Sequence, residues 1–195
     1  KRFLGPCAFT SESFLQSLEI PSKIDISVLV NASDVISDKT NPTKTICELF
    51  PLSAKESRVK IIRIATPLSE LNKLEEITDY LSNYGYFITI NLLKCHILDE
   101  EKISKLIKLL KRIKLDVLYI ADSLGCCFPE DITRIVKKIS SNYKGEIGIH
   151  CHDNKGLALA NTLSAMNAGA TFVDSTILGM GRGAGNIQTE IFLAE

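Results

Sequence analysis

His150 and His152 occupy alternate positions in the segment 146–152, and apolar residues fill the intervening positions. Side chains on a β-strand repeat every two residues, so both imidazoles point to the same face. Two histidines on one face can chelate one metal ion. A helical pattern from near Gly156 and a further strand at 171–177 complete a βαβ unit. Such units place active sites at the carboxyl ends of parallel strands, where we expect these ligands.

Strand-like runs alternate with amphipathic helical segments along the chain. We expect strands at 24–30, 59–64, 87–93, 117–121, 146–152 and 171–177, and helices at 11–18, 43–50, 69–83, 100–111 and from 129 and 156 onward. This rhythm indicates a parallel α/β architecture. Six strand–helix units fit either a doubly wound sheet or most of a TIM (β/α)8-type barrel, and spacing alone does not decide between them.

Polar residues at the predicted strand ends favour the barrel, because a barrel brings the carboxyl ends of all its strands together. The residues at or near these ends are Asn31, Arg63, Asn91, Asp122, His150 with His152, and Asp174. In a two-faced sheet they would not converge on one point. For Asn31 and Asp174 taken singly, capping a helix or ending a strand is the alternative.

Length and charge limit the classes of partner. The 195 residues, 45% of them hydrophobic, can bury one sizeable core, so a single domain over 1–195 is expected. Lysine plus arginine equals aspartate plus glutamate at 23 each, which argues against nucleic acid or a membrane surface as partner. No apolar run approaches the roughly 20 residues that span a bilayer. A small neutral or anionic substrate fits better.

The cysteines predict a reduced, cytoplasmic protein. They show no CxxC pair and no regular spacing, and stand at Cys7, Cys47, Cys95, Cys126, Cys127 and Cys151. This pattern argues against a disulfide framework and a zinc ribbon. A thiol nucleophile or soft-metal site at Cys126, Cys127 and Cys151 is the alternative. Cys151 should face away from the two histidines, so buried structural cysteines are favoured.

A glycine-rich segment follows the last predicted strand. Gly179, Gly181 and Ala184 fit a loose dinucleotide fingerprint. A true fingerprint follows the first strand of its unit and needs an acidic ribose ligand about 20 residues later, and neither condition holds. These glycines are better explained if the backbone passes close to a metal site or binds an anionic substrate group.

Three motifs together resemble the HMG-CoA lyase-like superfamily, also called the pyruvate carboxyltransferase domain. They are the stretch Gly-Ile-His-Cys-His-Asp-Asn-Lys-Gly-Leu-Ala-Leu-Ala-Asn at 148–161, the stretch Gly-Met-Gly-Arg-Gly-Ala-Gly-Asn at 179–186, and Ala-Asp-Ser-Leu-Gly at 121–125. The similarity is strong from Leu118 onward and loose before Ile61. Within the superfamily the chain is most similar to the 4-hydroxy-2-oxovalerate aldolase-like branch.

The resemblance implies roles for particular residues. His150 and His152 become ligands of a divalent metal, manganese, magnesium or zinc, with Asn186 near or on it. The residues expected to line the pocket as catalytic groups are Arg63, Asn91 and Asp122. The residues expected to bind substrate are Asn31, Gly181 and Gly183.

The expected activity is that of an aldolase or lyase. A divalent ion can act as a Lewis acid on a 2-oxo acid and stabilise the enolate formed when a C–C bond breaks or forms. The resemblance implies a small 2-oxo acid as substrate, and some aldolases of the family work with a partner dehydrogenase. Two alternatives stay open. One is an acyl-CoA-using synthase of the isopropylmalate or homocitrate type, and the other is a non-catalytic barrel module that binds a partner.

One family motif is missing from the sequence. The family carries an Asp-x-x-Arg-acidic-Gly strand that supplies a third metal ligand and an arginine, and this chain does not contain it. Six strands are predicted where a barrel needs eight. We therefore expect strands 3 to 8 of an N-terminally truncated barrel, lacking strands 1 and 2 and most of the last helix. Such a chain should be catalytically inactive, and its exposed edges predict self-association into a homo-oligomer or aggregate.

Overall fold

The computed structural model describes residues 11–36 and 41–195, so Cys7 lies outside the described residues. Six parallel strands form one sheet in which every strand pairs with its neighbours in sequence. They are β1 (Ile26–Asn31), β2 (Val59–Thr66), β3 (Phe87–Leu92), β4 (Val117–Asp122), β5 (Glu146–Cys151) and β6 (Phe172–Val173). A doubly wound sheet reverses its strand order at a switch point, whereas a barrel does not. The order therefore confirms an incomplete TIM-type barrel.

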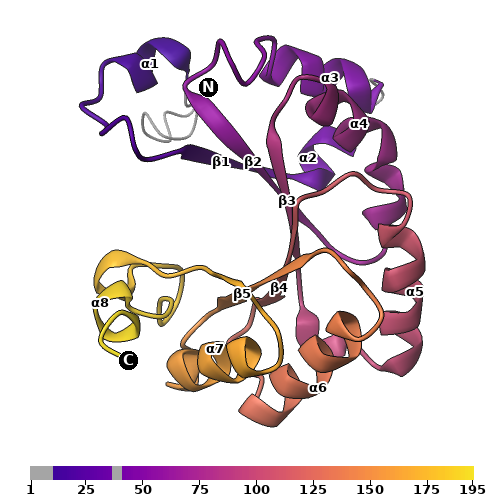
Figure 1. Cartoon of the computed structure of the whole chain (residues 1–195), viewed down its shortest axis with the longest axis vertical. Helices are drawn as coiled ribbons and strands as arrows, with labels where there is room; N and C mark the ends of the chain where they lie inside the picture. The colour runs from indigo at the N-terminus through magenta and orange to yellow at the C-terminus, as the bar shows by residue number, and fades with distance from the viewer. Residues whose placement is uncertain (1–10, 37–40) are drawn as a thin grey trace.

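The helices that connect the strands cover the outer side of the curved sheet (Figure 1). The α-helices are α1 (Glu12–Gln16), α2 (Ala32–Ile36), α3 (Pro42–Leu49), α4 (Glu75–Asn83), α5 (Glu100–Leu110), α6 (Pro129–Ser140), α7 (Ala158–Asn167) and α8 (Thr189–Phe192). Three 3-10 turns complete the described chain, η2 (Leu71–Lys73), η3 (Cys95–Ile97) and η4 (Ile177–Gly179). In the described residues no helix combines the length and apolar composition needed to cross a bilayer.

The core lies between the sheet and the helices. Apolar side chains at alternate strand positions, such as Ile62, Ile90 and Ile149, are fully buried in it. Each such side chain contributes about 1.5–3 kcal/mol when it leaves water. The remaining positions of the same strands face the inside of the curve, because the side chains of a strand alternate. This second set carries the polar residues Arg63 and His150.

Two helical segments differ from the pattern expected of the sequence. The helix predicted at 69–83 is divided into η2 and α4. In a 3-10 turn, side chains three residues apart are eclipsed, so Leu71 and Leu74 both enter the core and both are fully buried. Helix α2 was not predicted, and it forms because Ala32 and Val35 share one buried side.

The last strand is shorter than the predicted 171–177. Strand β6 contains two residues, although the Asp174 amide still donates to the Ile149 carbonyl oxygen at 3.0 Å. Thr176 then leaves the sheet and pairs with Gln188 in an isolated bridge. The chain after β6 is therefore held by the C-terminal segment, which brings the glycine-rich stretch back to the strand ends.

Candidate metal and substrate site

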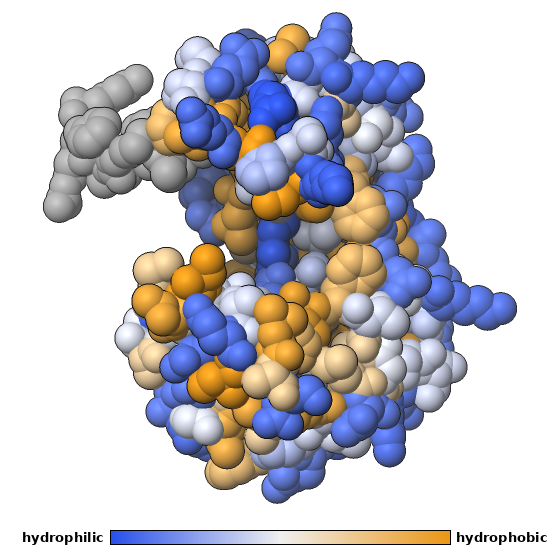
Figure 2. All heavy atoms as spheres, turned by 60° about the vertical axis from the view of Figure 1, so that its left-hand side comes forward, coloured by the Kyte–Doolittle hydropathy of each residue, from blue (hydrophilic) through white to orange (hydrophobic). Residues whose placement is uncertain are grey.

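A cavity of about 390 Å³ opens at the carboxyl ends of the strands. It is lined by Ser27, Leu29, Arg63, Ala65, Asn91, Leu93, Ala121, Ser123, His150, His152, Asp174, Ser175, Thr176 and Arg182. We call it the histidine cavity. Figure 2 shows the molecule hollowed between its two halves, with hydrophilic side chains deep in the hollow. Strands β1 to β5 all contribute to this lining, as the barrel architecture predicts.

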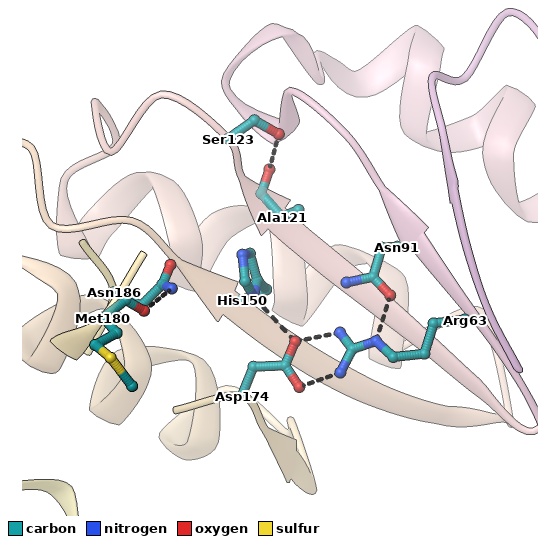
Figure 3. Close-up of polar contacts among 8 residues, drawn as sticks. All are labelled: Arg63, Asn91, Ala121, Ser123, His150, Asp174, Met180 and Asn186. Atoms are coloured by element: carbon teal, nitrogen blue, oxygen red, sulfur yellow. Dashed lines mark hydrogen bonds and ion pairs between the residues drawn. The ribbon is translucent and has the colours of Figure 1, made fainter. Parts of the chain in front are cut away.

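Asp174 joins an arginine to a histidine inside the cavity (Figure 3). The two terminal nitrogens of Arg63 donate to the two carboxylate oxygens of Asp174, with Nη1 to Oδ1 at 2.7 Å. His150 Nδ1 lies 2.9 Å from Asp174 Oδ2. Arg63 Nε also donates to Asn91 Oδ1 at 3.3 Å. A carboxylate that accepts from Nδ1–H leaves the Nε2 lone pair of the imidazole free to ligate a metal.

Arg63 and Asp174 hold each other in their charged forms. Burial alone would raise the pKa of Asp174, but hydrogen bonds from Arg63 and His150 lower it below its usual value. Burial likewise opposes the charge of Arg63, and the hydrogen bond to Asp174 raises the pKa of the guanidinium. The charge of Arg63 is therefore offset by Asp174, and the arginine acts on the cavity chiefly by orienting that carboxylate.

Tyr119 supports this arrangement from β4. Its ring lies under the Arg63 guanidinium, 4.7 Å from the central carbon to the ring centroid, within the range of a cation–π contact. Burial, and then the charge of Asp174, raise the pKa of Tyr119 to about 12. Gly148, the register partner of Tyr119, makes room for the ring, because a Cβ there would lie 2.5 Å from Tyr119 Cδ1.

The two histidines lie side by side. Their ring centroids are 5.1 Å apart and the ring planes are nearly perpendicular, at 84°. Burial, then the charges of His150 and Arg182, lower the pKa of His152 below its ordinary 6.5. His152 is therefore neutral at neutral pH, the form in which imidazole binds metals.

Asn186 lies opposite His152 and carries an unpaired oxygen, although it lines neither cavity. It forms an antiparallel bridge with His152, and its Nδ2 donates to the Met180 carbonyl oxygen at 3.0 Å. Its Oδ1 is buried and has no hydrogen-bond partner among the described residues. Leaving a buried acceptor unpaired costs about 1–3 kcal/mol, and a cation would satisfy it. Two imidazoles and an amide oxygen suit a divalent ion such as manganese or zinc, so the residues present fit the metal.

Gly181 belongs to the support of Asn186. A Cβ at Gly181 would lie 2.4 Å from Asn186 Nδ2, so a larger residue would push the amide out of position. Gly181 does not line the histidine cavity, whereas Gly183 lines a second cavity beside it. We expected both glycines to contact substrate, but of the two only Gly183 lines a cavity.

Asp122 differs from the expectation that it lines the pocket. Its side chain is fully buried, and its two oxygens accept from the amides of Cys126 and Cys127, each at 3.1 Å. The carboxylate closes the turn that follows β4, and it lines neither cavity. Asp122 shapes this part of the site through the backbone.

Asn31 lines the second cavity and not the first. Its Nδ2 donates to Asp34 Oδ2 at 2.9 Å, at the start of α2. The amide therefore combines the two roles weighed for it, since it bonds to the first turn of a helix and also faces a cavity.

Sequence reasoning missed two cations of this region, Arg182 and Lys94. Arg182 lines both cavities, and Lys94 lines the second. Arg182 stands inside the glycine-rich stretch, and a charged side chain among glycines was the signal that could have identified it. Lys94 follows a strand end by two residues, but no local pattern indicates the direction of its side chain.

Among the described residues, a further group of potential metal ligands is buried behind β4. The ligand atoms of Cys95, Asp122 and Cys127 lie within 4.8 Å of one another, and the two sulfurs are 3.6 Å apart. The hydrogen bond with Cys127 and burial raise the pKa of Cys95 well above its ordinary value. The Cys95 thiol stays protonated, and the Asp122 carboxylate already accepts from two backbone amides, so this cluster is better explained as core packing. Cys151 also lies in the core, facing away from the histidines as the alternation predicts.

Comparison with known sequences gives consistent matches. A family model described as HMGL-like matches residues 50–195. A 4-hydroxy-2-oxovalerate aldolase of Pelotomaculum thermopropionicum is 38% identical over 141 residues, which cover 72% of this chain and 42% of that protein. An oxaloacetate decarboxylase of Mycobacterium tuberculosis is 29% identical over 190 residues, which cover 97% of this chain and 53% of that protein. The chain thus spans about half the length of these relatives, or less.

Solved structures show the same architecture. The N-terminal domain of a candidate aldolase from Bacteroides vulgatus has a TM-score of 0.78 at 26% identity, covering 100% of this chain and 62% of that one. The HMG-CoA lyase of Bacillus subtilis has a TM-score of 0.72 at 19% identity, covering 93% of this chain and 65% of that one. At 19% identity the second likeness shows the fold alone.

Proposed function

The chain belongs to the HMGL-like family, and from this premise we propose that it is part of a divalent-metal-dependent aldolase. The reaction would make or break the C–C bond of a 2-oxo acid, as in a 4-hydroxy-2-oxo acid aldolase. The observation that carries the proposal is the pair His150 and His152 on one strand end, with Asp174 bound to Nδ1 of the first. The unpaired Oδ1 of Asn186, the bridge partner of His152, supports it.

The metal would be held by His150, His152 and Asn186. When bound, a divalent ion supplies Lewis acidity toward the oxygens of a 2-oxo acid and lowers the energy of the enolate that C–C cleavage leaves. The protein's own part is to orient His150 and to keep His152 neutral. Asp174 holds His150 by its Nδ1, and burial disfavours protonation of His152.

Asn91 is positioned to contact the substrate. Its side chain is buried, its Oδ1 accepts from Arg63, and its amide nitrogen lies on the side toward His150 (Figure 3). Because the oxygen is already paired, the free N–H groups can donate to a substrate oxygen. The Arg63 contact therefore fixes the amide orientation that presents a donor to the cavity.

The relatives' names support a 2-oxo acid as the substrate class. One is a 4-hydroxy-2-oxovalerate aldolase and another an oxaloacetate decarboxylase. Both reactions break the bond between C3 and C4 of a 2-oxo acid, and both leave the enolate of pyruvate. A single site that stabilises this enolate could serve both reactions. We therefore assign pyruvate or a close homologue as the part of the substrate that stays at the metal.

Calorimetry with manganese and then oxalate tests the proposal without requiring turnover. Oxalate is a planar dianion that resembles the enolate of pyruvate. We expect the chain to bind one manganese ion, and oxalate to bind only after manganese. His150→Ala and His152→Ala should each abolish both signals, whereas His96→Ala, at an exposed histidine outside both cavities, should change neither. Manganese binding that survives loss of both histidines would refute the proposed site.

A further inference from the structure

A second cavity of about 520 Å³ adjoins the histidine cavity. The two share five lining residues, Ala65, Leu93, Ser123, His152 and Arg182. The second, which we call the Lys94 cavity, is completed by Asn31, Lys94, Leu124, Asn154 and Gly183. A molecule bound at the histidines can therefore extend into this space, whose volume is typical of a small-molecule site.

The Lys94 cavity has a one-sided charge. Its lining contains the cations Lys94 and Arg182 and no acidic residue. Within the described part of the chain, neither cation is within ion-pair distance of a carboxylate. Arg63 in the histidine cavity is different, because Asp174 offsets its charge. The unbalanced positive charge of the joined cavities thus lies on the side of Lys94 and Arg182.

Ser123 holds both cationic segments at the cavity. The backbone amide of Lys94 donates to Ser123 Oγ at 2.9 Å. Lys94 adopts the left-handed conformation, with φ of 60°, which is strained for a residue with a Cβ and persists where neighbouring contacts determine it. Arg182 Nη2 lies 3.5 Å from the Ser123 carbonyl oxygen. This contact is long, so the guanidinium keeps most of its donors for a ligand.

We infer that the Lys94 cavity binds an anionic group, a carboxylate or a phosphate, on the reactant that joins or leaves the 2-oxo acid. The inference rests on the proposed function, since it places the other half of the substrate beside the metal ligands. The guanidinium of Arg182 offers a bidentate fork to such an anion, Lys94 adds a point charge, and the amides of Asn31 and Asn154 complete a polar wall. A short neutral aldehyde would leave both cations without a counter-charge.

Anion binding by the metal-free chain tests this inference. The probes are inorganic phosphate and succinate, titrated by calorimetry at low ionic strength. We expect Arg182→Gln to weaken binding about tenfold or more, and Lys94→Gln severalfold, as for loss of a charge-assisted hydrogen bond. Arg182→Lys should retain part of the affinity. Lys105→Gln, on the outer helix α5, is the matched control and should bind like the original chain.

The two probes distinguish the sources of the anion. Tighter binding of succinate assigns a carboxylate-bearing reactant, and tighter binding of phosphate assigns a phosphorylated one. No anion binding, or equal binding by the original chain and Arg182→Gln, would overturn the inference. Because the titration uses no metal, its failure is separable from failure of the manganese site. Circular dichroism of each variant would show that loss of binding is not loss of fold, as expected for exposed side chains.

Discussion

At the scale of single residues, the site depends on one carboxylate. Asp174 accepts from Arg63 and from His150, and it lies 111 residues from the first and 24 from the second. Sequence reasoning placed Asp174 at a strand end, but left open whether it only ended the strand. The ion pair could not be predicted, because it needs the register across several strands. The histidine pair could be predicted, because it depends only on local alternation.

Replacement of Asp174 should weaken metal binding. In Asp174→Asn the charge of Arg63 is no longer offset, and the stronger acceptor for His150 Nδ1–H is lost. We expect manganese affinity to fall by about 10–100-fold, the usual effect of removing a carboxylate behind a ligating histidine. Calorimetry measures the affinity, and nitrogen NMR of His150 reports its tautomer. Asp79→Asn, which breaks a surface ion pair with Lys114, is the control. Unchanged affinity and tautomer would contradict the role of Asp174.

His152 should make stability depend on pH. Its pKa in the folded chain is lowered below 6.5, so the unfolded chain binds more protons as the pH falls through this range. The contribution to the free energy of unfolding is complete above pH 6.5 and is lost as the pH drops through the folded pKa. The pKa of Asp174 is lowered below 3.8, so its contribution to the free energy of unfolding is lost only at lower pH. Urea titrations between about pH 8 and about pH 5 should show a smaller decline for His152→Gln, and equal declines would contradict this account.

At the scale of elements, strand register brings the site together. Ala65 pairs with Asn91, and Asn91 pairs with Tyr119 on β4. Ala121, two residues further along β4, pairs with His150, so the inner-face residues of neighbouring strands lie beside one another. The sequence predicted these strands because their apolar positions alternate or run continuously. It did not predict the fate of Asp122, because the backbone turns back at 125–127 and its amides bond to that carboxylate. Whether a polar side chain at a strand end faces the cavity therefore depends more on the direction of the following turn than on its position at the strand end.

Gly148 tests the packing between neighbouring strands. A methyl group there would overlap the Tyr119 ring, which lies under Arg63. We expect Gly148→Ala to lower the free energy of unfolding by about 1–3 kcal/mol, the usual cost of overpacking. The same change in a Tyr119→Leu background should cost clearly less, because the overlapping ring is absent. Equal costs in the two backgrounds, measured by urea denaturation, would show that the ring contact is not responsible.

At the scale of the whole molecule, the strand order in sequence and the likeness to HMGL-like structures establish part of a TIM-type barrel. The sequence predicted this class from the convergence of polar strand ends. It did not predict the positive cavity beside the histidines, because the net charge of the chain is zero and gives no sign of a local excess. Total charge does not report local balance, since Lys94 and Arg182 stand 88 residues apart and meet only in the folded chain.

Pulsed electron paramagnetic resonance of the manganese-loaded chain tests the central claim most directly. Manganese(II) is paramagnetic, and nitrogen-15 labelling of the histidine side chains makes any bound imidazole visible through its hyperfine coupling. The account predicts coupling from two histidine nitrogens in the original chain. Because either substitution abolishes manganese binding, His150→Ala and His152→Ala should show no bound-manganese signal under the same conditions. The His96→Ala spectrum should be unchanged. Bound manganese with no coupling to histidine nitrogen would place the metal elsewhere and contradict the proposed site.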